Sequence, residues 1–143
     1  MRTLIFTAFL SGMLLAASCN AQGRLAVELT ASSKPDDIVG QRLSYLVKEQ
    51  LGGSHTLQLT YDQTATRTHV YLVTLDPTHR GEMTVYSVTI TFDAPDIQGP
   101  IYMGSSVAAV GADNVDQAAQ GVVAEVSQSI DAFRANFQHR AGR

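Results

Sequence analysis

The stretch THVYLVTLDPTHRGEMTVYSVTITF, residues 68–92, is the densest run of β-branched and aromatic residues in the chain. Its second half alternates apolar with hydroxylated residues, and the apolar positions are Tyr86, Val88, Ile90 and Phe92. A period of two is typical of a strand with one buried and one wetter face. Between the halves, the segment DPTHRG at residues 76–81 contains proline and glycine, which favour a turn. The stretch therefore predicts two β-strands joined by a short polar turn.

Three further segments show the same alternation, and they are residues 24–31, 55–62 and 101–110. Together with the central pair they predict five strands. In the last segment, residues 104–106 are glycine and two serines. Because small residues in a strand often mark the close approach of another element, we expect a helix to pack over them.

Apolar residues at helical spacing predict a first helix after Ser33-Lys34-Pro35-Asp36. We expect the Ser33 hydroxyl to cap this helix, and Asp36 and Asp37 to lie where the positive end of its dipole stabilises them. Gly52-Gly53 predicts its end, since glycine readily takes the left-handed cap conformation.

A second apolar stripe, from Val115 to Phe137, recurs every three or four residues and predicts a long helix across the sheet, capped by Asp113 or Asn114. The order strand, helix, four strands, helix predicts an α+β two-layer sandwich. We expect a mostly antiparallel five-stranded sheet with both helices on one face. We also expect one domain over residues 22–138 and a polar tail over residues 139–143.

Residues 1–21, MRTLIFTAFLSGMLLAASCNA, predict an export signal. Arg2 supplies the positive start, and residues 4–17 form an apolar run that is followed by small residues. This run is shorter than the roughly 20 apolar residues needed to span a bilayer. We therefore expect a signal that is removed and a product in the periplasm, in the cell envelope or secreted.

Two routes of signal processing stay open. The small residues at Cys19 and Ala21 suit ordinary cleavage before Gln22. Residues 16–19, Ala-Ala-Ser-Cys, resemble the lipobox of bacterial lipoproteins, in which the cysteine is lipidated and becomes the mature N-terminus. The resemblance implies Cys19 as a lipid attachment site, although alanine replaces the usual leucine three residues before it.

Composition excludes several classes of function. The only cysteine is Cys19, so neither an internal disulfide nor a multi-cysteine zinc site can form. Ten basic residues, of which Arg2 would leave with the signal, stand against 13 acidic ones. Binding of nucleic acid requires a basic face, so we expect no nucleic-acid partner. We expect membrane contact only through a lipid anchor on Cys19.

The sequence contains no complete catalytic motif. Residues 104–106 lack the G-x-S-x-G pattern of a nucleophilic serine. The four histidines have no spacing that places two imidazoles on one ion, and no glycine-rich loop precedes a helix. We expect no metal, no cofactor and no catalytic residue. We expect His69 to be a hydrogen-bonded structural histidine, and Asp93 and Asp96 to be turn formers.

One group of chemically capable residues is close in sequence. Asp76, His79 and Arg80 fall in the predicted turn, and they could hold an anionic ligand or a partner's carboxylate, with arginine as a bidentate donor. The alternative is a solvated hairpin tip. The strand aromatics, which are Tyr61, Tyr71, Tyr86, Phe92 and Tyr102, we expect in the core or under a helix, with an exposed tyrosine-bearing face as the alternative.

The layout of export signal, strand, helix, strands and long C-terminal helix resembles that of small bacterial envelope lipoproteins, in particular the lipoprotein of the lipopolysaccharide-assembly translocon. The resemblance covers the mature chain as an order of elements, without a shared motif. It implies an envelope protein with a binding role.

Because the catalytic motifs are incomplete, we expect a non-catalytic module that binds another envelope protein or a small ligand, as an accessory subunit of an assembly or transport complex. The competing hypothesis is a small periplasmic or secreted hydrolase. A pocket that gathers His69 or His79 with Asp76 or Asp93 would favour the hydrolase. A flat exposed apolar patch would favour the binding module.

Overall fold

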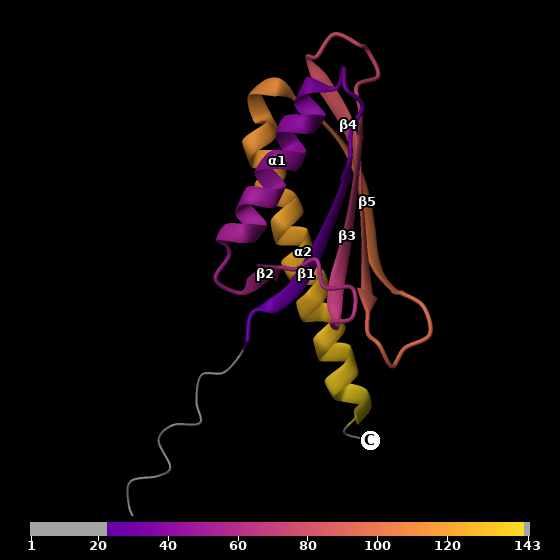
Figure 1. Cartoon of the computed structure of the whole chain (residues 1–143). Helices are drawn as coiled ribbons and strands as arrows, with labels where there is room; N and C mark the ends of the chain where they lie inside the picture. Colours follow the sequence, from indigo (N-terminus) through magenta and orange to yellow (C-terminus); the bar gives the residue numbers. More distant parts are fainter. Residues whose placement is uncertain (1–22, 142–143) are drawn as a thin grey trace, which may run out of the picture.

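The computed structural model describes residues 23–141, with side chains as far as Asn136. The signal segment and Cys19 therefore lie outside the described residues. The elements are β1 (Leu25–Ser32), α1 (Ile38–Gly53), β2 (Leu57–Leu59), β3 (Arg67–Leu75), β4 (Met83–Asp93), β5 (Ile101–Gly111), a 3-10 turn (Ala112–Asn114) and α2 (Val115–Ala141). This is the predicted α+β fold with five strands and two helices (Figure 1).

The sheet is mixed, so the prediction of a mostly antiparallel sheet was wrong. The strand order is β2-β1-β3-β4-β5, and β1 runs parallel to both β2 and β3, while β3–β4 and β4–β5 are antiparallel. Helix α1 carries the chain back along the sheet, which makes β2 parallel to β1. Since β2 has only three residues, the short link 60–66 suffices to return the chain to the start of β3.

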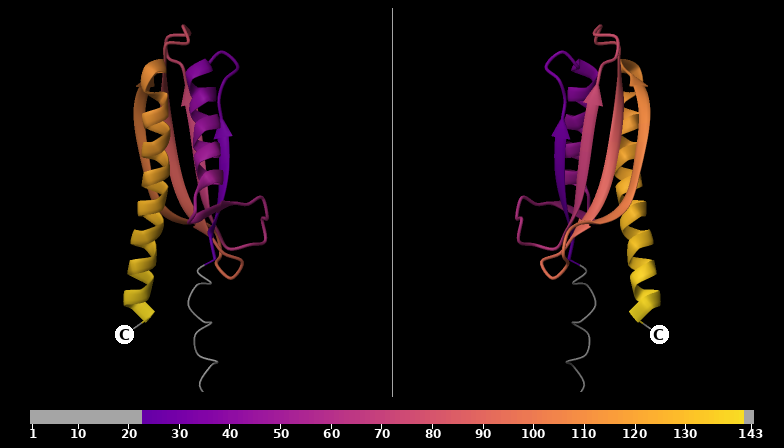
Figure 2. Two further views of the ribbon diagram at one scale, coloured as in Figure 1. Left: turned by 90° about the vertical axis from the view of Figure 1, so that its left-hand side faces the viewer. Right: turned by 90° about the vertical axis from the view of Figure 1, so that its right-hand side faces the viewer.

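Both helices cover one face of the sheet, and the other face has no covering layer (Figure 2). The core lies between the helices and the sheet. It includes Leu43 of α1, Val70 and Leu72 of β3, and Val126 of α2, all with no exposed surface. Val88 and Ile90 are also fully buried, which confirms the apolar face predicted for β4. A layer of helices on a sheet buries one stripe of each helix and one face of each strand.

Helix α1 begins later than the sequence indicates. Its N-cap is Asp37, whose Oδ1 accepts a hydrogen bond from the Gly40 N–H at 2.8 Å. The predicted Ser33 cap was wrong, because the fully buried Asp37 carboxylate also accepts from the Thr84 hydroxyl of β4 at 2.8 Å. The Ser33 hydroxyl instead accepts from the Thr74 hydroxyl at 2.9 Å.

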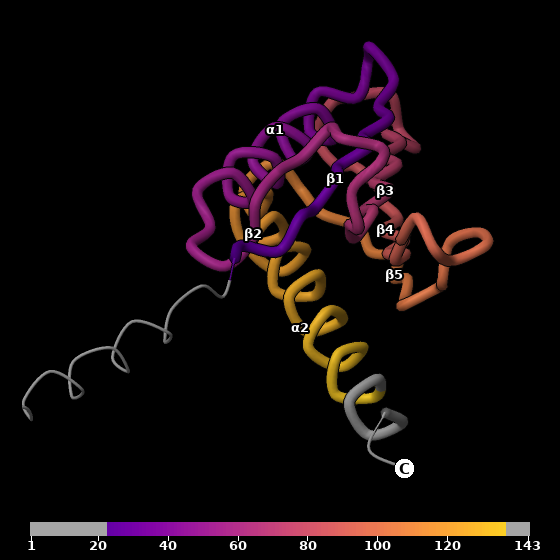
Figure 3. The backbone as a smooth tube through the Cα atoms, turned by 60° about the horizontal axis from the view of Figure 1, so that its bottom comes forward, coloured from indigo at the N-terminus to yellow at the C-terminus, as the bar shows by residue number. Residues whose placement is uncertain are grey.

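The remaining local predictions fit with shifted boundaries. The second strand is shorter than residues 55–62. Helix α1 ends at Gly53 as predicted, but neither Gly52 nor Gly53 takes the expected left-handed conformation, and the C-cap is Ser54 in an extended conformation. The expected packing over residues 104–106 is confirmed: the Ser106 hydroxyl donates to Glu125 of α2 at 2.7 Å. Helix α2 continues past the end of the sheet (Figure 3). Its last residue is Ala141, so the helix includes the first part of the predicted tail.

Candidate functional site

The turn between β3 and β4 is organised around Asp76, which is 2% exposed. Its Oδ2 accepts from the Gly81 N–H at 2.7 Å, and its Oδ1 accepts from the N–H groups of Thr78 and His79 at 2.8 and 3.0 Å and from the Thr78 hydroxyl at 2.8 Å. These hydrogen bonds, with that from Gly81 the largest, lower the pKa of Asp76 from 3.8 to about 2. Asp76 is therefore occupied in holding the turn.

The backbone N–H of His79 bonds to Asp76, but its imidazole contacts a different carboxylate. His79 has a φ of +56°, and its Nδ1 lies 2.8 Å from Asp36 Oδ2 in the segment before α1. That contact lowers the pKa of Asp36. The turn is thus joined to the start of α1, while Arg80 is exposed. A binding role for Asp76, His79 and Arg80 stays a prediction.

The uncovered face of the sheet carries large apolar side chains. Strand register places Leu75 opposite Val85 and Val85 opposite Ala109, and places Ser87 between Val73 and Val107. We define the outer-face patch as Tyr71, Val73, Leu75, Val85, Val107 and Ala109. Val73 is 50% exposed and Val107 is 73% exposed. The patch therefore offers apolar surface at the centre and at the free β5 edge.

Three tyrosines depart from the expectation that strand aromatics lie in the core. Tyr71 is 39% exposed and Tyr102 is 63% exposed, because their positions alternate onto the face that no helix covers. Tyr61 is 67% exposed, since β2 ends before it. The alternative interpretation, a tyrosine-bearing open face, describes Tyr71 and Tyr102 better.

A polar cluster borders the outer-face patch. Arg67 Nε lies 2.6 Å from Glu28 Oε2, although neither atom makes a directional hydrogen bond, and Arg67 also lies 3.8 Å from Asp93. His69 Nε2 is 2.9 Å from the Thr30 hydroxyl, which confirms a hydrogen-bonded histidine. The expectation that Asp93 only forms a turn misses this cluster, whose residues come from three strands.

Part of the cluster has the order of a catalytic triad. Thr30, His69 and Asp93 stand as hydroxyl, imidazole and carboxylate, but His69 Nδ1 is 3.8 Å from Asp93, too far for a hydrogen bond. The His69 ring also stacks on Tyr71 at 3.9 Å between centroids. Thr30 lies within β1, where pairing with β3 uses some of the backbone N–H groups from which an oxyanion hole would have to be built.

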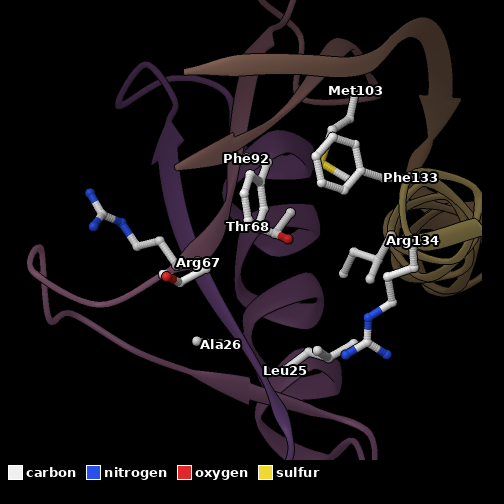
Figure 4. A pocket seen from close by; sticks show the side chains of 10 residues that line it. Leu25, Ala26, Arg67, Thr68, Phe92, Met103, Phe133 and Arg134 are labelled. Atoms are coloured by element: carbon white, nitrogen blue, oxygen red, sulfur yellow. The ribbon is translucent and has the colours of Figure 1, made fainter. Parts of the chain in front are cut away.

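A cleft of about 350 Å³ lies between the sheet and the second half of α2 (Figure 4). Its lining residues are Leu25, Ala26, Thr66, Arg67, Thr68, Phe92, Met103, Ile130, Phe133 and Arg134. The Phe92 and Phe133 rings are 4.8 Å apart. The cleft contains neither His69 nor Asp93, so the histidine–carboxylate pocket expected of a hydrolase does not occur there. Sequence patterns could not reveal the cleft, because it depends on how α2 crosses the sheet.

The described residues contain no group of three or more histidine or acidic side chains placed to hold a metal ion. Between residues 23 and 141, no helix is long and apolar enough to cross a membrane.

Comparison with protein-family models gives no match, and comparison with curated proteins gives none either. Among solved structures, the hypothetical protein CT253 from Chlamydia trachomatis is similar over 76% of this chain and 99% of its own, with 10% identity and a TM-score of 0.51. At that identity the similarity concerns the fold alone. The rare lipoprotein B from Shewanella oneidensis aligns over 78% of this chain and 99% of its own, with 18% identity and a TM-score of 0.38.

Proposed function

We propose that this chain is an exported, non-catalytic module of a bacterial envelope that binds another envelope protein through its outer-face patch. The observation that carries the proposal is a sheet with helices on one face only and exposed apolar side chains on the other. In its narrower form, the proposal makes the protein an accessory subunit of an assembly or transport complex.

The composition of this face suits a protein partner. The apolar side chains of Val73 and Val107 are bordered on one side by the polar cluster around Arg67 and His69. Protein interfaces commonly combine an apolar centre with a polar rim. Apolar side chains that gather on one exposed face also favour association, since contact with a partner removes them from water.

The test places a photoreactive amino acid at single positions of the full-length chain in intact bacteria. We expect cross-linking to one envelope protein from Val73 and from Val107. Tyr45 is the matched control, because it is 65% exposed but lies on α1, on the opposite side of the molecule. Equal cross-linking from Tyr45, or none from the two valines, would refute binding through the outer face.

A hydrolase is the second candidate, favoured by the Thr30–His69–Asp93 order. Chromogenic esters provide the assay, with His69→Gln as the variant, since glutamine keeps a hydrogen-bonding side chain but cannot act as a base. An esterase rate that His69→Gln abolishes would support a hydrolase and contradict a non-catalytic role. A rate unchanged in His69→Gln would remove this candidate site.

A further inference from the structure

The cleft beneath α2 has a lining that the protein's own packing leaves partly uncovered. Leu25, Phe92, Met103 and Phe133 are all intermediate in burial, whereas Ile130 is 5% exposed. A ligand that covered these side chains would be favoured by the apolar surface it removes from water. The cleft is separate from the outer-face patch, which lies on the other face of the sheet.

The shape of the cleft limits what fits. One wall comes from the ends of β1, β3 and β4 together with β5, and the other from α2 (Figure 4). Its volume of about 350 Å³ is at the lower end of the range for ligand pockets. This volume suits one flexible apolar chain better than a two-chain lipid.

The charges around the cleft select the head of such a ligand. No acidic side chain lines it. The guanidinium of Arg67 points away from the cleft, toward Glu28 and Asp93, which neutralise it (Figure 4). Arg134 lies at the rim near Leu25, and among the described residues it forms no ion pair. An anion at this rim would meet the Arg134 guanidinium, for which the described residues supply no ion-pair partner.

We propose that the cleft binds a single-chain fatty acid, with the acyl chain beside Phe92, Met103 and Phe133 and the carboxylate at Arg134. The apolar lining contributes most of the affinity, because it accounts for most of the contact surface. Arg134 selects the charged head over an uncharged one, since a guanidinium donates paired hydrogen bonds to a carboxylate.

The experiment uses the full-length chain, exported with its own signal and stripped of bound lipid on a hydrophobic resin. Binding of dansyl-undecanoic acid is followed by its fluorescence, and palmitate and hexadecanol are the competitors. We expect one probe per chain, at every protein concentration, with a Kd in the micromolar range of about 1–50 μM. Palmitate should compete better than hexadecanol.

Three variants locate the site. Arg134→Gln should weaken the binding of palmitate by about fivefold and leave the binding of hexadecanol unchanged, as expected for an exposed charge pair. Met103→Trp, which narrows the cleft, should weaken both competitors at least about tenfold. Arg42→Gln is the matched control, since Arg42 is an exposed helical arginine paired with Asp116 outside the cleft, and it should change nothing.

Circular dichroism and thermal unfolding of each variant establish that it is folded, and if Met103→Trp does not fold, Met103→Phe replaces it. The proposal is overturned if the folded chain fails to bind the probe, or if Arg134→Gln and Arg42→Gln behave alike. A probe stoichiometry that falls as protein concentration rises would also overturn it, because a second copy would then occupy the cleft. None of these results affects binding through the outer face.

Discussion

The Asp76 carboxylate makes the β3–β4 turn sensitive to acid. Its pKa is lowered from 3.8 to about 2, chiefly by the Gly81 N–H. Because the folded-state pKa lies below the ordinary value, this stabilisation is fully present above about pH 4 and is lost as the pH falls through about 2. We expect Asp76→Asn to be less stable than the wild type at pH 6, with a smaller further loss between pH 4 and 2.

Urea unfolding at a series of pH values measures this effect. Asp96→Asn is the matched control, since it changes an exposed aspartate in the loop between β4 and β5. Parallel pH profiles for the wild type and Asp76→Asn would contradict the assignment of acid sensitivity to Asp76.

Gly40 is required by a close approach rather than by its backbone angles. A Cβ at this position would overlap Asp37 Oδ2 and the Thr74 hydroxyl oxygen. Both atoms belong to the buried polar group around the α1 N-cap, which cannot move without losing hydrogen bonds. We expect Gly40→Ala to lower the free energy of unfolding by about 1–3 kcal/mol.

Substitution of Gly121 by alanine should have the opposite effect on the free energy of unfolding. Gly121 lies on the exposed side of α2, and nothing lies within 4 Å of a Cβ built there. Gly121→Ala should raise the free energy of unfolding by about 0.5–1 kcal/mol through helix propensity. If both alanines stabilise the protein, Asp37 and Thr74 are not held as the structure has them.

Successive residues of strand β3 point alternately to the buried face and to the open face of the sheet. Leu72 has no exposed surface, whereas Val73 is 50% exposed. We expect Leu72→Ala to lower the free energy of unfolding by about 2–5 kcal/mol, and Val73→Ala to change it by less than about 1 kcal/mol. Thermal or urea unfolding measures both. Equal losses would mean that something covers the outer face in the isolated protein.

The elements that were predicted well depend on local patterns. Alternation in residues 86–92 specifies a strand face, and the stripe from Val115 specifies a helix, because periodicity follows backbone geometry. The mixed sheet depends instead on which strands become neighbours. Parallel pairing of β1 with β3 joins segments about 40 residues apart, and no local pattern reports that choice.

The prediction of Ser33 as the α1 N-cap failed for a related reason. Ser33 satisfies the local preference for a hydroxyl N-cap, yet Asp37 caps the helix because Thr84 of a distant strand completes its hydrogen bonds. Tertiary contacts here override a local signal. The same buried group explains why Gly40 occurs at the third helical position.

For the whole molecule, the candidate sites follow from how layers and strands are arranged. His69 was identified from its position in a strand, but its neighbours Thr30 and Asp93 come from two other strands. The outer-face patch requires that both helices lie on one side, which the sequence predicted. The cleft requires the path of α2 over Phe92 and Met103, which it did not.

The route of signal processing decides whether the folded domain is tethered to a membrane. β1 begins at Leu25, so a lipid on Cys19 would hold the domain close to a membrane surface by a linker of a few residues. We expect bacteria to remove the signal from the full-length chain, and intact mass measurement of the product reads the new N-terminus. A product that begins at acylated Cys19 and sediments with membranes would identify a lipoprotein. A soluble product that begins at Gln22 would identify a free exported protein.

Cys19→Ser separates these routes in the same measurement. If the wild type is lipidated, the variant should lack the acyl mass and should no longer be found as the mature membrane-bound form, since only a cysteine thiol accepts the lipid. If cleavage occurs before Gln22, both chains should give the same mature mass, because residue 19 is then removed. Retention of residues 1–21 in the wild-type product would contradict export by a cleaved signal. A tethered product would also restrict partners of the outer-face patch to proteins within reach of that membrane.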